Sequence, residues 1–128
     1  MKFEELYQLA LLVAKPRQLS DSAEAGGVGA AVLAESGRVY TGVCIDTACS
    51  MGFCAEHAAA AAMVTAGENR ILKVAAVNHE GAVLPPCGRC REFLSQLHPE
   101  NLSAEVMVAK DKIATLRELL PYDWQICK

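Results

Sequence analysis

Apolar residues follow two different spacings along the chain, and each spacing predicts one kind of element. Near the N-terminus they recur at helical spacing, which predicts a helix over residues 3–14 that ends before Pro16. Later runs are shorter and rich in β-branched residues, which is typical of strands. Strands are therefore expected at residues 28–33, 39–45, 71–77, 105–109 and 113–115.

Helical segments alternate with the later strands. One helix is expected over residues 55–66, with Gly67 as the residue just past its end, and another over residues 88–97. A last helical turn is expected at residues 116–120. The five consecutive alanines at residues 58–62 indicate a helix that lies close against the sheet or against a neighbour.

The order of these elements predicts the fold class. Residues 18–27 are small and polar, and residues 46–53 have no clear period, so both segments are expected to be irregular. A helix, a hairpin and then alternating strands and helices favour an α/β fold. We expect a three-layer α/β/α sandwich with a mixed central sheet of about five strands, in a single domain over residues 1–128.

Composition and charge exclude several classes of protein. The 128 residues are 52% hydrophobic and carry a net charge of -3 without a basic run, so we expect a buried core and no polymeric nucleic acid partner. The longest uncharged stretch, residues 57–67, is too short to cross a bilayer. Glu4 and Glu5 argue against a signal peptide. These features predict a soluble, cytoplasmic protein that does not bind membranes.

Cysteines supply the candidate chemistry. A core this apolar needs no disulfides, so reduced thiols are expected. Cys54 and the Cys87-x-x-Cys90 pair stand at two expected helix starts, where the helix dipole favours thiolates. Three thiolates leave one position of a tetrahedral Zn²⁺ open, which is typical of a catalytic metal rather than a structural one. Glu56 is placed to move protons beside it. The remaining three cysteines are expected to be ordinary thiols.

The pattern Cys54-x-Glu56 followed by Pro86-Cys87-x-x-Cys90 matches the known signature of zinc deaminases, with Cys in place of the usual His. Residues 37–42, 86–91 and 117–121 also resemble the small cytidine deaminases, and residues 97–99 resemble blasticidin S deaminase in particular. The resemblance implies the deaminase α/β/α fold, one catalytic Zn²⁺ per subunit and a homotetramer. It also implies hydrolytic deamination of a cytosine nucleoside or its analogue to the uracil form plus ammonia, with Glu56 as proton shuttle.

The resemblance also assigns substrate-binding positions. Cys44 and Asp46 stand where the family has an Asn and a Glu that hold the ribose hydroxyls. The thiol cannot replace an amide as a hydrogen-bonding group, so altered sugar recognition is expected. Ala55 and Trp124 are the other implied substrate contacts, and Trp124 would close the pocket of a neighbouring subunit.

One departure concerns the charge of the metal site. His57 replaces the family's usual Arg, which offsets the negative charge of three thiolates. We expect Arg89 or Arg91 to take part of that task. His79 is expected to be a surface or turn residue.

Other functional hypotheses remain open from the sequence. A thiol redox protein would use Cys87 and Cys90, although Pro86 and Arg89 fit the surroundings of such a pair poorly. A non-catalytic zinc-containing binding module would keep the fold and the metal but would have no use for Glu56. A third hypothesis is a deaminase of blasticidin S or of another aminopyrimidine, with altered sugar recognition.

Overall fold

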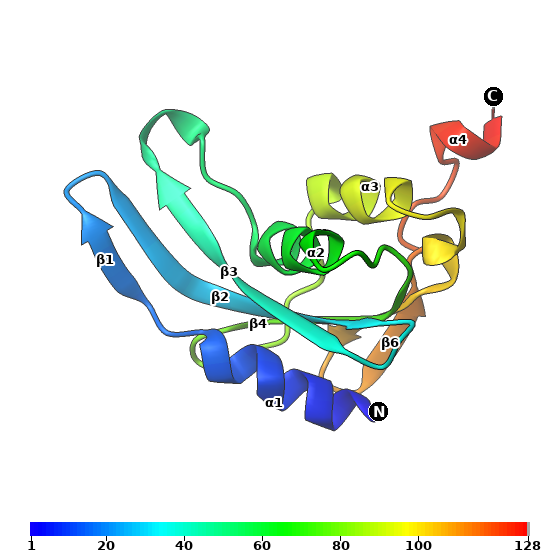
Figure 1. The fold of residues 1–128 in the computed structure, drawn as a ribbon, viewed down its shortest axis with the longest axis horizontal. Coiled ribbons are helices and arrows are strands. Elements are labelled where there is room, and N and C mark those ends of the chain that lie inside the picture. The colour runs from blue at the N-terminus through cyan, green and yellow to red at the C-terminus, as the bar shows by residue number, and fades with distance from the viewer. Residues whose placement is uncertain (128) are drawn as a thin grey trace.

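The computed structural model describes residues 1–127 and arranges them in three layers, a mixed sheet between helices (Figure 1). The elements are α1 Phe3–Val13, β1 Arg17–Ser20, β2 Ala23–Ala34, β3 Val39–Thr47, η1 Ala48–Ser50, α2 Ala55–Thr65, β4 Ile71–Asn78, α3 Gly88–Gln96, η2 Pro99–Ser103, β5 Glu105–Ala109, β6 Lys112–Thr115 and α4 Trp124–Cys127. The three-layer α/β/α sandwich expected from the sequence is confirmed. None of the helices in this range is long and apolar enough to cross a membrane.

Strand β2 organises the sheet. The strand order is β1-β2-β4-β5-β6, and β3 pairs with the other edge of β2. All pairs are antiparallel except β4 with β5, which is parallel. The long β2 strand therefore holds β3 on one side, and β1 and β4 in succession on the other.

The sheet has six strands rather than about five, because residues 18–27, which were expected to be irregular, form parts of two strands. Strand β1 occupies the start of that segment, and β2 begins at Ala23. All four residues of β1 are exposed, so β1 has no buried face to leave an alternating pattern in the sequence. Its pairing with β2 is what defines it as a strand.

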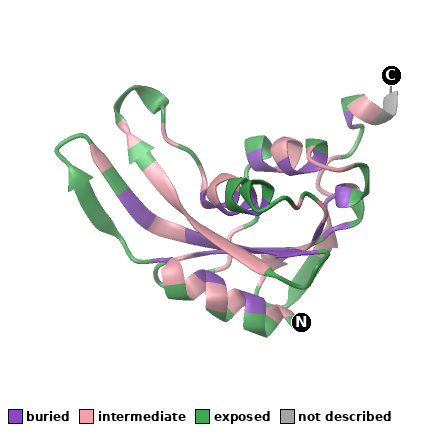
Figure 2. Ribbon diagram, in the orientation of Figure 1, coloured by how far each residue is buried: buried purple, intermediate pink, exposed green. Residues whose placement is uncertain are grey.

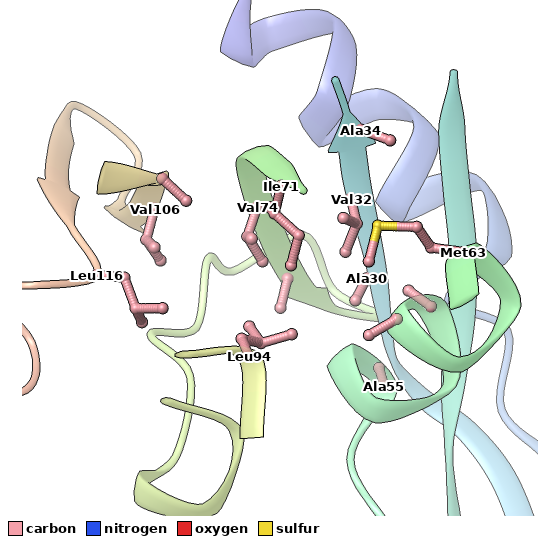
Figure 3. Packing of buried hydrophobic residues seen from close by; sticks show 14 residues of the cluster. Ala30, Val32, Ala34, Ala55, Met63, Ile71, Val74, Leu94, Val106 and Leu116 are labelled. Atoms are coloured by element: carbon pink, nitrogen blue, oxygen red, sulfur yellow. The ribbon is translucent and has the colours of Figure 1, made fainter. Parts of the chain in front are cut away.

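Helices cover both faces of the sheet. Helix α1 packs on one face through Leu6 and Ala10, which meet Leu33 and Val77. Helices α2 and α3 cover the other face (Figure 3), in a cluster made by Ala30, Val32, Ala55, Met63, Val74, Leu94, Val106 and Leu116, among others. Because both faces are covered, β2 is buried almost continuously from Gly29 onward, as strands between two helical layers usually are.

The alanine-rich helix α2 lies unusually close to β3. A Cβ atom built on Gly42 of β3 would lie 2.4 Å from the backbone nitrogen of Ala59 and 2.6 Å from the Cβ of Ala58. Only a glycine facing small residues permits this approach. The expectation that the alanine run marks a closely packed helix is confirmed, and the close packing fixes the height of α2 above the sheet.

The C-terminal segment differs from expectation. Residues 116–120 form hydrogen-bonded turns, with Leu119 N donating to Leu116 O and Leu120 N donating to Arg117 O. The expected helical turn is thus present only as these two consecutive turns and is not a helix, and the last short helix, α4, begins at Trp124. Pro121 follows these turns directly, and a proline disfavours helical backbone in the residue before it.

Replacing Gly42 by Ala should destabilise the protein by about 2–3 kcal/mol, because the added methyl collides with the α2 backbone in a packed interface. Urea unfolding followed by circular dichroism measures this change. The matched control is Gly88→Ala, where an added Cβ meets nothing within 4 Å. Equal unfolding midpoints for the two variants would contradict the close α2–β3 contact.

Candidate active site

Two helix starts bring three cysteine sulfurs together. Cys54 is the N-cap of α2, Cys87 is the N-cap of α3, and Cys90 lies one turn into α3. The Sγ atoms of Cys54 and Cys87 are 3.4 Å apart, and those of Cys87 and Cys90 are 3.6 Å apart. All three sulfurs lie within 4.8 Å of one another. The structure thus gathers the three cysteines that the sequence singled out.

The sulfur triangle fits a tetrahedral zinc ion. Zinc–sulfur bonds of about 2.3 Å in a tetrahedron place two sulfurs about 3.8 Å apart. Burial is the main cause that raises the pKa of the Cys54 and Cys90 thiols, and neighbouring charge adds to it. Burial also opposes ionisation of Cys87, but hydrogen bonds, first from the backbone of Cys90, lower the pKa of that thiol. Cys54 and Cys90 therefore resist ionisation in the bare triad, and a dication among the sulfurs would reverse that preference. The donor set and its spacing both suit Zn²⁺.

The loop before α2 is shaped to deliver Cys54. Phe53 and Ile45 exchange two backbone hydrogen bonds, so the chain folds back onto β3 immediately before the helix. Gly52 has no room for a side chain, because a Cβ atom would lie 2.0 Å from the carbonyl oxygen of Ile45. Cys49 and Ser50 turn the chain in the left-handed region, with φ of 62° and 55°. Cys49 is exposed and lies apart from the triad.

Glu56 lies beside the triad in the first turn of α2. Its side chain is buried, with 5% of the residue exposed, and no described cation pairs with it. Burial raises the pKa of the Glu56 carboxyl, and hydrogen bonds from its own backbone N–H and from Cys90 partly offset this. A carboxyl group whose pKa is raised by burial is suited to accepting and returning a proton.

A cleft of about 540 Å³ opens above the triad. Its walls come from β2, β3, the start of α2 and the segment between β4 and α3, and they are lined by Gly27, Val28, Cys44, Asp46, Phe53, Cys54, Ala55, Glu56, Asn78, His79, Leu84, Pro85 and Cys87. The volume is within the range of pockets that hold small molecules. The cleft brings together Glu56, two of the three sulfurs and three of the four expected substrate-binding residues, Cys44, Asp46 and Ala55.

Trp124, the fourth expected substrate-binding residue, lies elsewhere in this chain. Its indole Nε1 donates to Glu92 on α3 at 3.0 Å, and 55% of the residue is exposed. It does not line the cleft of its own chain. A role in a neighbouring subunit's pocket stays a prediction. The side chain of Cys127 lies outside the described part of the chain.

Cys44 also forms a hydrogen bond with the backbone of β2, which the sequence did not indicate. Strand β2 bulges between Ala25 and Gly29, so that residues 26–28 lie opposite Cys44 alone. The backbone N–H of Val28 donates to the Cys44 sulfur at 3.2 Å. The Cys44 sulfur thus accepts a hydrogen bond from a backbone N–H at the bulge, and Cys44 also lines the cleft.

His57 supports the buried sulfur of the triad. Its Nδ1 lies 3.2 Å from Cys90 Sγ, and its ring stacks on Phe93 with centroids 4.2 Å apart. Burial and then the charge of Arg89 lower the pKa of His57, so the imidazole is neutral near pH 7. A neutral ring whose Nδ1 carries the proton donates a hydrogen bond to the sulfur.

The two arginines of α3 differ in their roles. The Arg91 guanidinium donates to the carbonyl oxygens of Pro86 and Leu119, at 2.7 and 3.2 Å, and so joins the start of α3 to the turn after β6. Arg89 is exposed, and its charge acts on His57. His57 is therefore the residue that contacts a triad sulfur directly, whereas the Arg91 side chain hydrogen-bonds to backbone carbonyl groups.

Seven of the residues that line the cleft were not assigned to the site from the sequence: Gly27, Val28, Phe53, Asn78, His79, Leu84 and Pro85. Phe53 and Leu84 line the cleft from the two segments that precede Cys54 and Cys87, and their place next to the motif was the only available signal. His79 follows β4 and is exposed, as expected for a turn residue, but it also lines the cleft. Nothing in the local sequence pattern points to that position.

Three cysteine sulfurs and a buried carboxyl group meet at an open cleft, and the three sulfurs are a donor set that suits a zinc ion. Residues 1–106 match the family model of the cytidine and deoxycytidylate deaminase zinc-binding region. The chain belongs to this family.

Individual relatives agree with this assignment. Cytidine deaminase of Mycobacterium tuberculosis is 44% identical over 68 residues, which cover 52% of this chain and 51% of that relative. The aligned chain thus spans about half the length of this relative. Blasticidin-S deaminase of Bacillus cereus is 30% identical over 103 residues, with 73% and 74% covered. The crystal structure of the Mycobacterium tuberculosis cytidine deaminase matches with a TM-score of 0.81 and 31% identity, covering 97% of this chain and 98% of that one.

Replacing His57 by Ala should weaken zinc retention by about tenfold or more, because the Cys90 sulfur loses its hydrogen-bond donor. Competition with a chromogenic chelator measures the affinity. His57→Asn can keep a donor near the sulfur and should lose less. Unchanged zinc affinity in His57→Ala would show that the contact does not stabilise the metal site.

Proposed function

We propose that this protein is a zinc-dependent hydrolytic deaminase that converts a cytosine nucleoside, or a nucleoside analogue, to its uracil form and ammonia. The observation that carries the proposal is the position of Glu56. Its carboxyl group is buried at the base of a cleft that also exposes the sulfurs of Cys54 and Cys87. Family membership and the match to cytidine deaminases support the same reaction.

We assign Cys54, Cys87 and Cys90 as the ligands of one Zn²⁺ ion. When bound, zinc supplies a Lewis acid that makes water a nucleophile near neutral pH. The helix dipoles at Cys54 and Cys87 favour the thiolate forms that the ion requires. Cys54 and Cys87 border the cleft, whereas Cys90 is buried and does not line it, so an ion held by the three sulfurs would be accessible from the cleft.

Glu56 carries the protons of the reaction. Its carboxylate accepts a proton from the attacking water and delivers it to the ring nitrogen, as oxygen bonds to the carbon that bears the amine. It then transfers the second water proton to the leaving amine, so that ammonia departs and a carbonyl remains. The buried position of Glu56 excludes bulk water from these transfers. Ala55 would contact the substrate through its backbone N–H, which is free of helical partners in the first turn.

The other hypotheses explain fewer features of the site. A redox protein needs only Cys87 and Cys90, and it leaves the adjacent Cys54 sulfur and Glu56 without a task. In a non-catalytic binding module, Glu56 would have no function to offset the free-energy cost of burying its carboxyl group. Both would keep the fold, but neither requires a carboxyl at the base of a cleft.

The proposal extends to the oligomeric state of the protein and to its place in the cell. We propose a homotetramer that works in the cytoplasm, in which Trp124 of one subunit approaches the cleft of its neighbour. The exposed indole and the small residues on the outer face of α2 would suit such contacts. Sedimentation velocity measures the assembly, and a monomer at working concentration would refute it.

Replacing Glu56 by Gln should reduce deamination of cytidine by about a hundredfold or more, because the amide cannot accept and return a proton. The loss of ultraviolet absorbance as cytidine becomes uridine measures the rate. Zinc content and the unfolding midpoint should stay at wild-type values. Glu105→Gln, an exposed change on β5, is the matched control. Wild-type turnover by Glu56→Gln would remove Glu56 from the mechanism.

Replacing Cys44 by Asn should raise the preference for cytidine over cytosine by about five- to tenfold, because an amide supplies hydrogen bonds to a sugar hydroxyl that a thiol lacks. The ratio of kcat/KM for the two substrates measures this preference. Cys49→Asn is the control, since Cys49 is exposed and asparagine tolerates its left-handed backbone. A strong wild-type preference for cytidine that Cys44→Asn leaves unchanged would show that position 44 does not decide sugar recognition.

A further inference from the structure

The segment that delivers Cys87 to the triad has little backbone support of its own. The last N–H in it that donates to another element is that of Leu84, which bonds to β4 at 2.9 Å. Pro85 and Pro86 follow, and a proline has no N–H to donate. The loop before α2, by contrast, is held to β3 by a pair of backbone hydrogen bonds. The approach to Cys87 therefore has to be fixed by another group.

Arg91 on α3 supplies that support. Its side-chain Nε donates to the carbonyl oxygen of Pro86 at 2.7 Å, and its backbone N–H donates to the carbonyl oxygen of Cys87 at 3.0 Å. Pro86 is buried, and no other hydrogen bond to its carbonyl is present within residues 1–127. One residue thus holds the peptide groups on both sides of Cys87.

These two hydrogen bonds constrain the position of the Cys87 sulfur. A peptide group is planar, so the carbonyl of Pro86 lies in one plane with the nitrogen and the Cα of Cys87. Holding that oxygen limits where the Cys87 Cα can lie, and the carbonyl of Cys87 is held on its other side. Sulfurs around a tetrahedral zinc ion stay about 3.8 Å apart, so a small shift of this Cα would weaken the binding of the ion.

The Arg91 guanidinium is itself held from its far side. Helix α3 is buried on one side and exposed on the other (Figure 2), and Arg91 is half-buried. Its terminal nitrogen donates to the carbonyl oxygen of Leu119 at 3.2 Å. The N–H of Leu119 donates in turn to the carbonyl oxygen of Leu116, a fully buried residue of the core. Arg91 therefore joins the segment before α3 to a turn that is anchored in the core.

We propose, on the basis of the proposed zinc-dependent function, that Arg91 is a positioning residue for the metal ligand Cys87. It acts through hydrogen bonds to two carbonyl groups, which a planar guanidinium makes in fixed directions, rather than through its charge. Arg91 does not line the cleft, so it influences the reaction only through the position of the Cys87 sulfur.

Replacing Arg91 by Gln should weaken zinc binding by about tenfold, as is typical when a group that orients a metal ligand is lost. Competition with a chromogenic chelator measures the affinity of the full-length protein. Arg91→Lys keeps the charge but cannot make both hydrogen bonds in the same directions, so its affinity should lie between those of the wild type and Arg91→Gln. Arg117→Gln, which removes the same charge from an exposed position in the turn after β6, is the matched control and should bind zinc as the wild type does.

Two further measurements separate positioning from a general loss of stability. Cobalt(II) in place of zinc gives visible absorption bands that depend on the sulfur ligands and their geometry, and Arg91→Gln should change these bands. With zinc in excess, kcat for cytidine should fall by about tenfold in Arg91→Gln while KM changes by less than about twofold, because Arg91 does not touch the substrate. If Arg91→Gln does not fold, Arg91→Lys carries the same three measurements.

The outcomes separate this inference from the deaminase proposal. If Arg91→Gln keeps the zinc affinity and the cobalt spectrum of the wild type, or if Arg91→Lys matches the wild type in both, the positioning role is overturned while the deaminase function stands. If the zinc-loaded wild type does not deaminate cytidine, the proposed function fails, and the zinc affinities and cobalt spectra still decide the role of Arg91.

Discussion

The site depends on two helix starts that lie close enough for their cysteine sulfurs to touch. Cys54 and Cys87 are both N-caps, and their Sγ atoms are 3.4 Å apart although 33 residues separate them in the chain. This meeting requires α2 to sit low on β3, which Gly42 permits. It also requires the Phe53–Ile45 pairing that turns the chain into α2. Small changes in either contact would move a sulfur out of the triad.

The same geometry sets the electrostatics of the site. A triad of thiols beside a buried carboxyl is a costly arrangement, because burial raises the pKa values of Cys54, Glu56 and Cys90. A divalent cation at the centre offsets that cost and keeps the sulfurs ionised. His57 adds a hydrogen bond to Cys90 rather than the full charge that an arginine would bring.

Most of the elements that the sequence could predict have a buried face. Helix α1, strands β2, β4 and β5 and helices α2 and α3 all bury apolar residues, and the triad follows from the motif. Strands β3 and β6 have no fully buried residue, but their apolar and β-branched residues still indicated strands. Strand β1 could not be found in this way, because none of its residues is buried. The contact of His57 with Cys90 and the place of His79 in the wall of the cleft depend on long-range packing, which no local spacing encodes.

The most direct test of this account is the zinc content of the purified protein, measured by plasma mass spectrometry together with zinc-edge X-ray absorption. The account predicts one zinc ion per chain, with three sulfur neighbours and one light-atom neighbour, and it predicts loss of the ion in Cys87→Ser. A protein that holds no zinc after folding in the presence of zinc, or an ion bound by four protein ligands, would contradict the catalytic site described for Cys54, Cys87 and Cys90.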